Sequence, residues 1–107
     1  MKKIIFMVEG KDYGKLKDIL AADPYADDSF AKSGYVLKES KPMGLKGGFY
    51  LIYVKTADDS LVLKLKARLA VLPTLKELEG PDFESVVSQI EAQEDSAASG
   101  FGSLFGD

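Results

Sequence analysis

The chain has 107 residues, of which 46% are hydrophobic and 29% are charged, and its formal net charge at pH 7 is −3. This length and balance predict one folded domain with a single core. The negative net charge argues against nucleic acid as a partner, because phosphate contacts require a dense basic surface. Histidine and cysteine are both absent, which excludes imidazole catalysis, thiolate nucleophiles, disulfides and zinc–sulfur sites. We therefore expect a protein that is not an enzyme, with no catalytic, cofactor-binding or metal-binding residues.

The apolar run at residues 4–8 is the part of the chain that most resembles a targeting segment. It is far shorter than the roughly 20 residues that cross a bilayer. Glu9, Lys11 and Asp12 follow it at once, and no small-residue cleavage site comes after them. We interpret the run as a first β-strand and expect a cytoplasmic protein without a membrane partner.

The first third of the chain predicts a strand followed by a helix. Residues 3–8 are β-branched, aromatic and aliphatic, as is typical of a buried strand. Asp12 can cap the next helix through its carboxylate, and Asp23-Pro24 ends that helix because the residue before proline avoids helical geometry. Asp28-Ser29 is expected to cap a short second helix through Lys32, which Gly34 closes.

Residues 35–40 and 49–55 predict two further strands joined by a glycine-rich loop at 42–48. Side chains alternate between the two faces of a strand. The second of these strands therefore places Phe49, Leu51 and Tyr53 on one face and Tyr50, Ile52 and Val54 on the other.

The remaining segments predict a helix, a weak strand and a second helix. Capping residues at 57–60 open the first helix, and Pro73 lies just past its end. Residues 74–79 are the strand candidate. Pro81 favours the first turn of the last helix, whose apolar residues Phe83, Val86, Val87 and Ile90 recur at helical spacing.

The order strand, helix, strand, strand, helix, strand predicts an α+β fold of the ferredoxin-like split βαββαβ type. In this arrangement an antiparallel sheet carries its helices on one face. An extra C-terminal helix and a tail are added to it. We expect one α/β domain at residues 1–95 and a flexible, glycine- and aromatic-containing tail at 96–107, whose glycines oppose helix and strand.

Two segments resemble the ACT-like regulatory domains, which are ferredoxin-like modules. Residues 8–16 (VEGKDYGKL) are similar to that family's turn from a strand into a helix, and residues 69–78 (LAVLPTLKEL) are similar to its second helix entering the last strand. The resemblance implies an amino acid or other small ligand at a dimer interface, held near Gly10, Asp12 and Gly14. The plainer interpretation of these three residues, a tight turn before a capped helix, is the one we favour.

The apolar surface that remains predicts association. Both faces of the strand at 49–55 require burial, so the face opposite the helices needs a cover from a partner, the added helix or the tail. We expect a small non-enzymatic binding or assembly module that contacts a protein partner or a second copy. The alternative is the ACT-like regulatory domain with its small ligand, and an enzyme remains conceivable only as a carboxylate–metal hydrolase using Asp27-Asp28 or Asp58-Asp59. The candidate partner-binding residues are Tyr50, Ile52, Val54, Phe101, Leu104 and Phe105.

Overall fold

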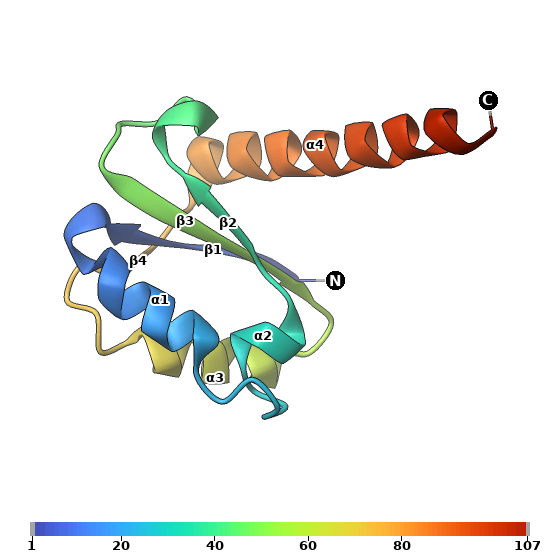
Figure 1. The fold of residues 1–107 in the computed structure, drawn as a ribbon. Helices are drawn as coiled ribbons and strands as arrows, with labels where there is room; N and C mark the ends of the chain where they lie inside the picture. The colour runs from blue at the N-terminus through green and yellow to red at the C-terminus, as the bar shows by residue number, and fades with distance from the viewer. Residues whose placement is uncertain (1, 107) are drawn as a thin grey trace.

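A computed structural model of the protein describes the backbone of residues 2–106 and the side chains of residues 2–93. It contains one antiparallel sheet with the strand order β2-β3-β1-β4. The strands are β1 (Lys2–Glu9), β2 (Val36–Glu39), β3 (Phe49–Thr56) and β4 (Lys76–Glu77). The long strands β1 and β3 lie at the centre of the sheet (Figure 1). The predicted α+β class with an antiparallel sheet is confirmed.

The central pair and the edge strand β4 differ greatly in length. Strands β1 and β3 pair along their whole length, from Lys2 opposite Thr56 to Glu9 opposite Phe49. Strand β4 pairs with β1 only at two positions, although residues 74–79 are predicted to form it. The backbone N–H of Leu78 also donates to the Ile5 carbonyl at 2.9 Å. The segment 74–79 thus runs along β1, but only Lys76 and Glu77 pair with it as a regular strand.

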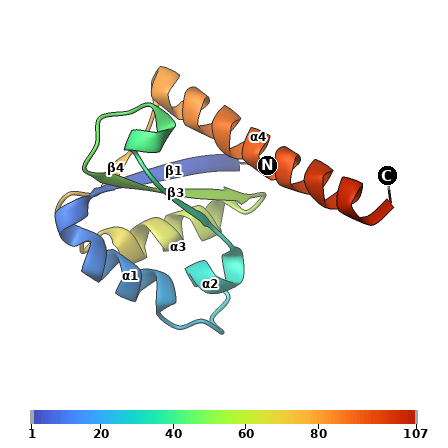
Figure 2. The same ribbon diagram turned by 45° about the horizontal axis from the view of Figure 1, so that its top comes forward.

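Three helices cover one face of the sheet. They are α1 (Tyr13–Ala21), α2 (Phe30–Ser33) and α3 (Asp59–Leu69), and Figure 2 shows all three on the same side of the strands. The core on this side joins alternate residues of β1 and β3 to the apolar faces of the helices. Its most deeply buried members include Phe6, Ile52, Leu16, Phe30 and Leu65.

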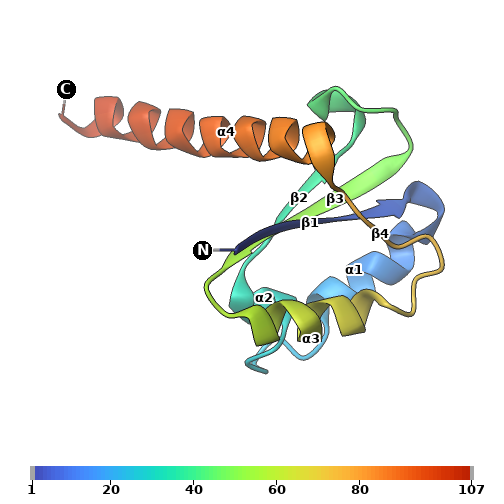
Figure 3. The ribbon, with the colours of Figure 1, turned by 180° about the vertical axis from the view of Figure 1, so that it is seen from behind.

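The fourth helix, α4 (Gly80–Gly106), covers the opposite face of the sheet, as Figure 3 shows from behind. Val86, Val87 and Ile90 pack there against Ile5 and Leu51. Neither face of the central strands is therefore open. The prediction of an open face carrying Tyr50, Ile52 and Val54 is wrong, because those side chains point toward the layer of α1, α2 and α3 and α4 supplies the cover for the other face.

The backbone of α4 continues as a helix through residues 96–106, where the sequence predicts a non-helical tail. Glycine in a helix interior costs about 1 kcal/mol relative to alanine. Such a penalty opposes a helix without forbidding it, and the alanines and serines at 96–99 have no breaker among them. The helix ends at Gly106, and α4 projects beyond the edge of the sheet (Figure 1).

Two of the three predicted helix caps are confirmed. The Ser29 hydroxyl accepts the N–H of Lys32 at 3.1 Å, and Gly34 closes α2 with φ +83°. The Asp58 carboxylate accepts the N–H groups of Ser60 and Leu61 at the start of α3. Asp12 precedes α1 but accepts no N–H there, so its predicted capping role is wrong. Within the part of the chain whose helices are described, none is long and apolar enough to cross a membrane.

Candidate functional site

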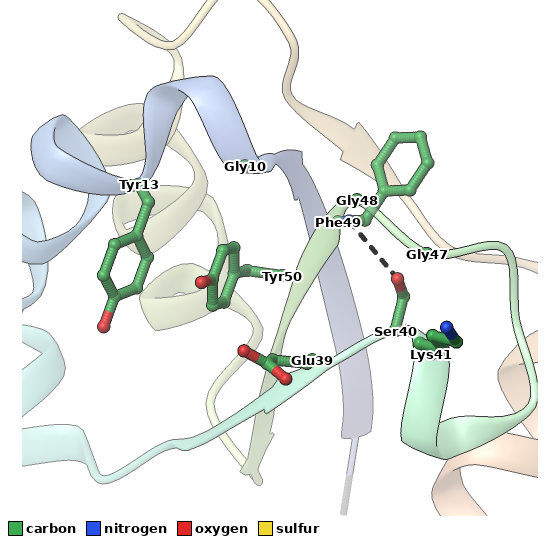
Figure 4. A pocket seen from close by; sticks show the side chains of 9 residues that line it. All are labelled: Gly10, Tyr13, Glu39, Ser40, Lys41, Gly47, Gly48, Phe49 and Tyr50. Carbon is green, nitrogen blue, oxygen red and sulfur yellow. Dashed lines mark hydrogen bonds between the residues drawn. The ribbon is translucent and has the colours of Figure 1, made fainter.

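A depression of about 350 Å³ opens where the end of β1 meets the loop between β2 and β3. The start of α1 forms one wall, and the end of β2 and the start of β3 form the others (Figure 4). This site brings together segments that lie far apart in the sequence. Its lining residues are Gly10, Tyr13, Glu39, Ser40, Lys41, Gly47, Gly48, Phe49 and Tyr50.

Two glycines allow the backbone segments to approach closely at the floor of the site. The N–H of Gly10 donates to the carbonyl of Gly48 at 2.8 Å, and a Cβ at position 10 would lie 3.4 Å from that oxygen. Gly48 itself has φ +96°, a conformation that side chains oppose. The loop therefore closes onto the first turn because glycine stands at both positions.

Two tyrosines form the aromatic wall. The rings of Tyr13 and Tyr50 are stacked, with centroids 4.2 Å apart and an interplanar angle of 21°. Figure 4 shows the two rings side by side above the Glu39 carboxylate. The Lys17 ammonium lies 5.6 Å from the centre of the Tyr13 ring, within the range of a cation–π contact. The two rings thus form one continuous aromatic surface on this side of the depression.

Ser40 holds the loop that closes the site. Its hydroxyl donates to the carbonyl of Lys46 at 2.6 Å and accepts the N–H of Phe49 at 3.3 Å. Its carbonyl accepts the N–H groups of Met43 and Leu45. The Ser40 side chain is buried, so these bonds are shielded from water. One residue at the end of β2 thus sets the path of the whole loop.

Of the three residues predicted to form a ligand turn, only Gly10 lines the depression. The Asp12 carboxylate points inward and accepts the Thr74 hydroxyl at 2.6 Å. Gly14 lies on the exposed side of α1 with open space beside its Cα. The depression thus includes one residue of the predicted ligand turn, and ligand binding by this turn stays a prediction.

The predicted partner-binding residues fall into two groups. Ile52 and Val54 are buried in the core, and Tyr50 is half-buried in the wall of the depression. The side chains of Phe101, Leu104 and Phe105 lie outside the residues whose side chains are described. The role of these three residues in partner binding therefore stays a prediction.

Three of the four carboxylates considered as metal ligands, those of Asp27, Asp28 and Asp58, are engaged in ion pairs or a cap. Arg68 donates to the Asp28 carboxylate at 2.9 Å, and this bond holds the pKa of Asp28 below its ordinary value. Asp27 pairs with Lys32 at 3.0 Å. The pKa of Asp58 is lowered by the N–H of Leu61 and by Ser60. In the described part of the chain, no three acidic side chains gather into a metal-binding cluster.

The lining of the depression is suited to binding. Glu39 and Lys41 place a carboxylate and an ammonium on its rim, and the two tyrosines add aromatic surface beside exposed glycine backbone. These groups fit a small molecule that carries both charges and an apolar part. Comparison with protein-family models, with curated proteins and with solved structures finds no match for this chain.

Several residues of the site had no signal in the sequence. Tyr13 and Tyr50 meet only because the sheet places the start of α1 beside β3. Ser40 follows β2 as an ordinary polar residue, and its bonds to the loop depend on where the loop returns. A glycine pair at 47–48 directly before an aromatic strand was the one local hint of a close backbone approach.

Proposed function

We propose that this protein is a small, non-enzymatic binding or assembly module of ferredoxin-like type that works in the cytoplasm. Its contact surface is the C-terminal part of α4, with Phe101, Leu104 and Phe105 as the contact residues. The strand order supports the fold assignment, because β3 lies between β1 and β2 and β1 lies between β3 and β4. The two strand–helix–strand units are therefore interleaved, as in the split arrangement.

The length of α4 is the observation that carries this proposal. The described side chains of α4 that pack on the sheet are Phe83, Val86, Val87 and Ile90. The backbone then continues as helix to Gly106, which at 1.5 Å per residue adds roughly 24 Å beyond Ile90. A helix that projects from its domain and carries large apolar residues is a typical means of docking on another surface.

A capture experiment with matched variants tests the proposal. The full chain is immobilised beside a variant carrying Phe101→Ala, Leu104→Ala and Phe105→Ala. The control carries Ser96→Ala, Ser99→Ala and Ser103→Ala, which introduces the same number of alanines into the same helix and keeps the three apolar residues. We expect the full chain and the control to retain the same protein partner, in an amount at least tenfold greater than the apolar variant retains. That partner can be this chain itself. Equal capture by all three would contradict the proposal.

The depression supports a second candidate, the ACT-like regulatory domain that binds an amino acid or another small ligand. The opposite charges of Glu39 and Lys41 and the tyrosine stack favour a small zwitterion. Ligand binding to the folded state raises the melting temperature by mass action. We expect one amino acid from a complete panel to stabilise the protein, and Glu39→Gln to abolish that shift. A flat panel at millimolar ligand would remove this candidate.

A further inference from the structure

The last turns of α4 repeat a short sequence that occurs where the helix packs on the sheet. Residues 83–87 read Phe-Glu-Ser-Val-Val, and residues 101–105 read Phe-Gly-Ser-Leu-Phe. Both have an aromatic residue, a serine two positions later and then two apolar residues. The segments are separated by 18 residues, which is about five turns at 3.6 residues per turn. The two segments therefore occupy corresponding positions on one side of the same helix.

The first segment shows which surface accepts this pattern. Val86 is fully buried and Val87 is nearly so, and both pack on the sheet face formed by Ile5 and Leu51. Phe83 is half-buried beside them. Because segment 101–105 has the same pattern of apolar residues, it is suited to pack on a sheet face of the same kind. The first segment already covers the middle of that surface in its own molecule.

A hollow lies on the sheet near the point where α4 leaves it. Val36 and Tyr53 belong to the same packed cluster as Ile90, and both line a hollow of about 280 Å³. Glu91, the next residue of α4, pairs with Lys3 at the start of β1. The hollow and the exit of α4 are therefore neighbours. Its lining residues are Ser33, Gly34, Tyr35, Val36, Tyr53 and Lys55.

A second copy of the chain can bring the repeated segment to this hollow. If the stretches 91–106 of two copies lie antiparallel and fully overlapped, the end of each lies beside Glu91 of the other. Segment 101–105 of one copy then reaches the hollow beside the other copy's α4 exit. The arrangement is two-fold and closed, as is usual for dimers.

The charges favour the antiparallel direction. Glu91, Glu94 and Asp95 cluster at the start of the stretch, and residues 96–106 carry no charge. A parallel pair would place the acidic clusters side by side, whereas an antiparallel pair sets each beside an uncharged segment.

We propose that the partner of the α4 extension is a second copy of this chain, with segment 101–105 of each copy seated in the hollow at Val36 and Tyr53 of the other. This inference rests on the proposed function and names its partner. Sedimentation equilibrium over a concentration series provides the test. We expect the full chain and the Ser96→Ala, Ser99→Ala, Ser103→Ala control to form dimers. The Phe101→Ala, Leu104→Ala, Phe105→Ala variant should be monomeric, with dimerisation weakened at least a hundredfold.

Two cysteine variants test the geometry. The chain has no cysteine, so an introduced one reports its own neighbours. Ala97→Cys, close to the middle of the overlap, should form a disulfide between copies under mild oxidation, and Ala92→Cys should not. Efficient disulfide formation at both positions would indicate a parallel pair and overturn the geometry.

A monomeric full chain at about 1 mM, a concentration that would populate even a weak dimer, overturns the second copy as partner. Dimerisation that survives the three alanine substitutions at 101, 104 and 105 overturns it as well. The capture experiment distinguishes failure of the self-association proposal from failure of the proposed function. A monomeric chain that still captures a different protein through these residues retains the proposed function, whereas a monomeric chain that captures nothing loses both.

Discussion

Thr74 joins two segments that lie far apart in the sequence. Its hydroxyl donates to the Asp12 carboxylate at 2.6 Å and accepts the N–H of Glu9 at 3.1 Å. Asp12 is 6% exposed, so its charge is largely removed from water and depends on this partner. The bond ties the end of β1 to the segment leading into β4, and it explains why Asp12 does not cap α1.

Substituting Thr74 by valine preserves the shape of the side chain and removes its hydroxyl. We expect the free energy of unfolding to fall by about 1–3 kcal/mol, because a buried carboxylate and a backbone N–H lose their partner. Thr56→Val is the matched control, since the Thr56 hydroxyl accepts a bond at an exposed site and should change stability by about 0.5 kcal/mol or less. Equal shifts in urea denaturation midpoint for the two variants would contradict this account.

Helix α3 shows how an element is defined by its ends. Asp58 caps its first turn, and the apolar positions Val62, Leu65 and Leu69 are buried against the sheet. Arg68, in its last turn, bonds to Asp28 and Asp23 in the loop that follows α1. The sequence predicts the cap because it is a local pattern. The ion pairs of Arg68 connect elements 40 and 45 residues apart and have no local signal.

The cap of α3 should contribute to the acid sensitivity of the fold. The N–H of Leu61 and then Ser60 lower the pKa of Asp58 from its ordinary value of 3.8. A carboxyl whose pKa is lowered on folding stabilises the protein above the unfolded value, and that stability is lost as the pH falls through the lower folded value. Asp58→Asn retains a capping oxygen without a charge. We therefore expect a smaller loss of melting temperature than in the parent chain as the pH falls below about 4.

Asp58→Ala serves as the reference for this comparison, because it removes the capping oxygen at every pH and should lower the melting temperature already at pH 7. If the asparagine variant and the parent chain lose stability in parallel below pH 4, the cap does not contribute to acid sensitivity.

At the scale of the whole molecule, the sheet is enclosed between two layers of different size. Three helices cover one face, and the first turns of α4 cover the other. Among the side chains of α4 that the structure describes, Ile90 is the last one packed on the sheet. The next residue, Glu91, pairs with Lys3. We therefore expect the projecting part of α4 to contribute little to the cores of the domain.

Ending the chain at Asp95 should leave the domain folded. As far as side chains are described, both packed clusters lie before that residue. We therefore expect the melting temperature to change by less than about 4 °C, the shift that roughly 1 kcal/mol produces at this size. The amide resonances of α1 and α3, which pack on the other face of the sheet from the proposed contact, would show retained packing directly. Unfolding of the shortened chain would show that the extension is a structural element and would exclude its role as a separable contact segment.

The sequence by itself determined the elements whose signals are local. The apolar runs of β1 and β3, the caps at Ser29 and Asp58, and the stripe at Phe83, Val86 and Ile90 are each set by neighbouring residues. The absence of histidine and cysteine likewise limits the chemistry of the chain in any fold.

Only the tertiary structure decided which face of β3 meets which helices, because alternation defines two faces without naming their partners. It also turned Asp12 toward Thr74 and brought Tyr13 onto Tyr50. The physical reason is that such contacts depend on where distant segments return after the chain has folded. The residues next to each contacting side chain carry no pattern that predicts which distant segment will lie beside it.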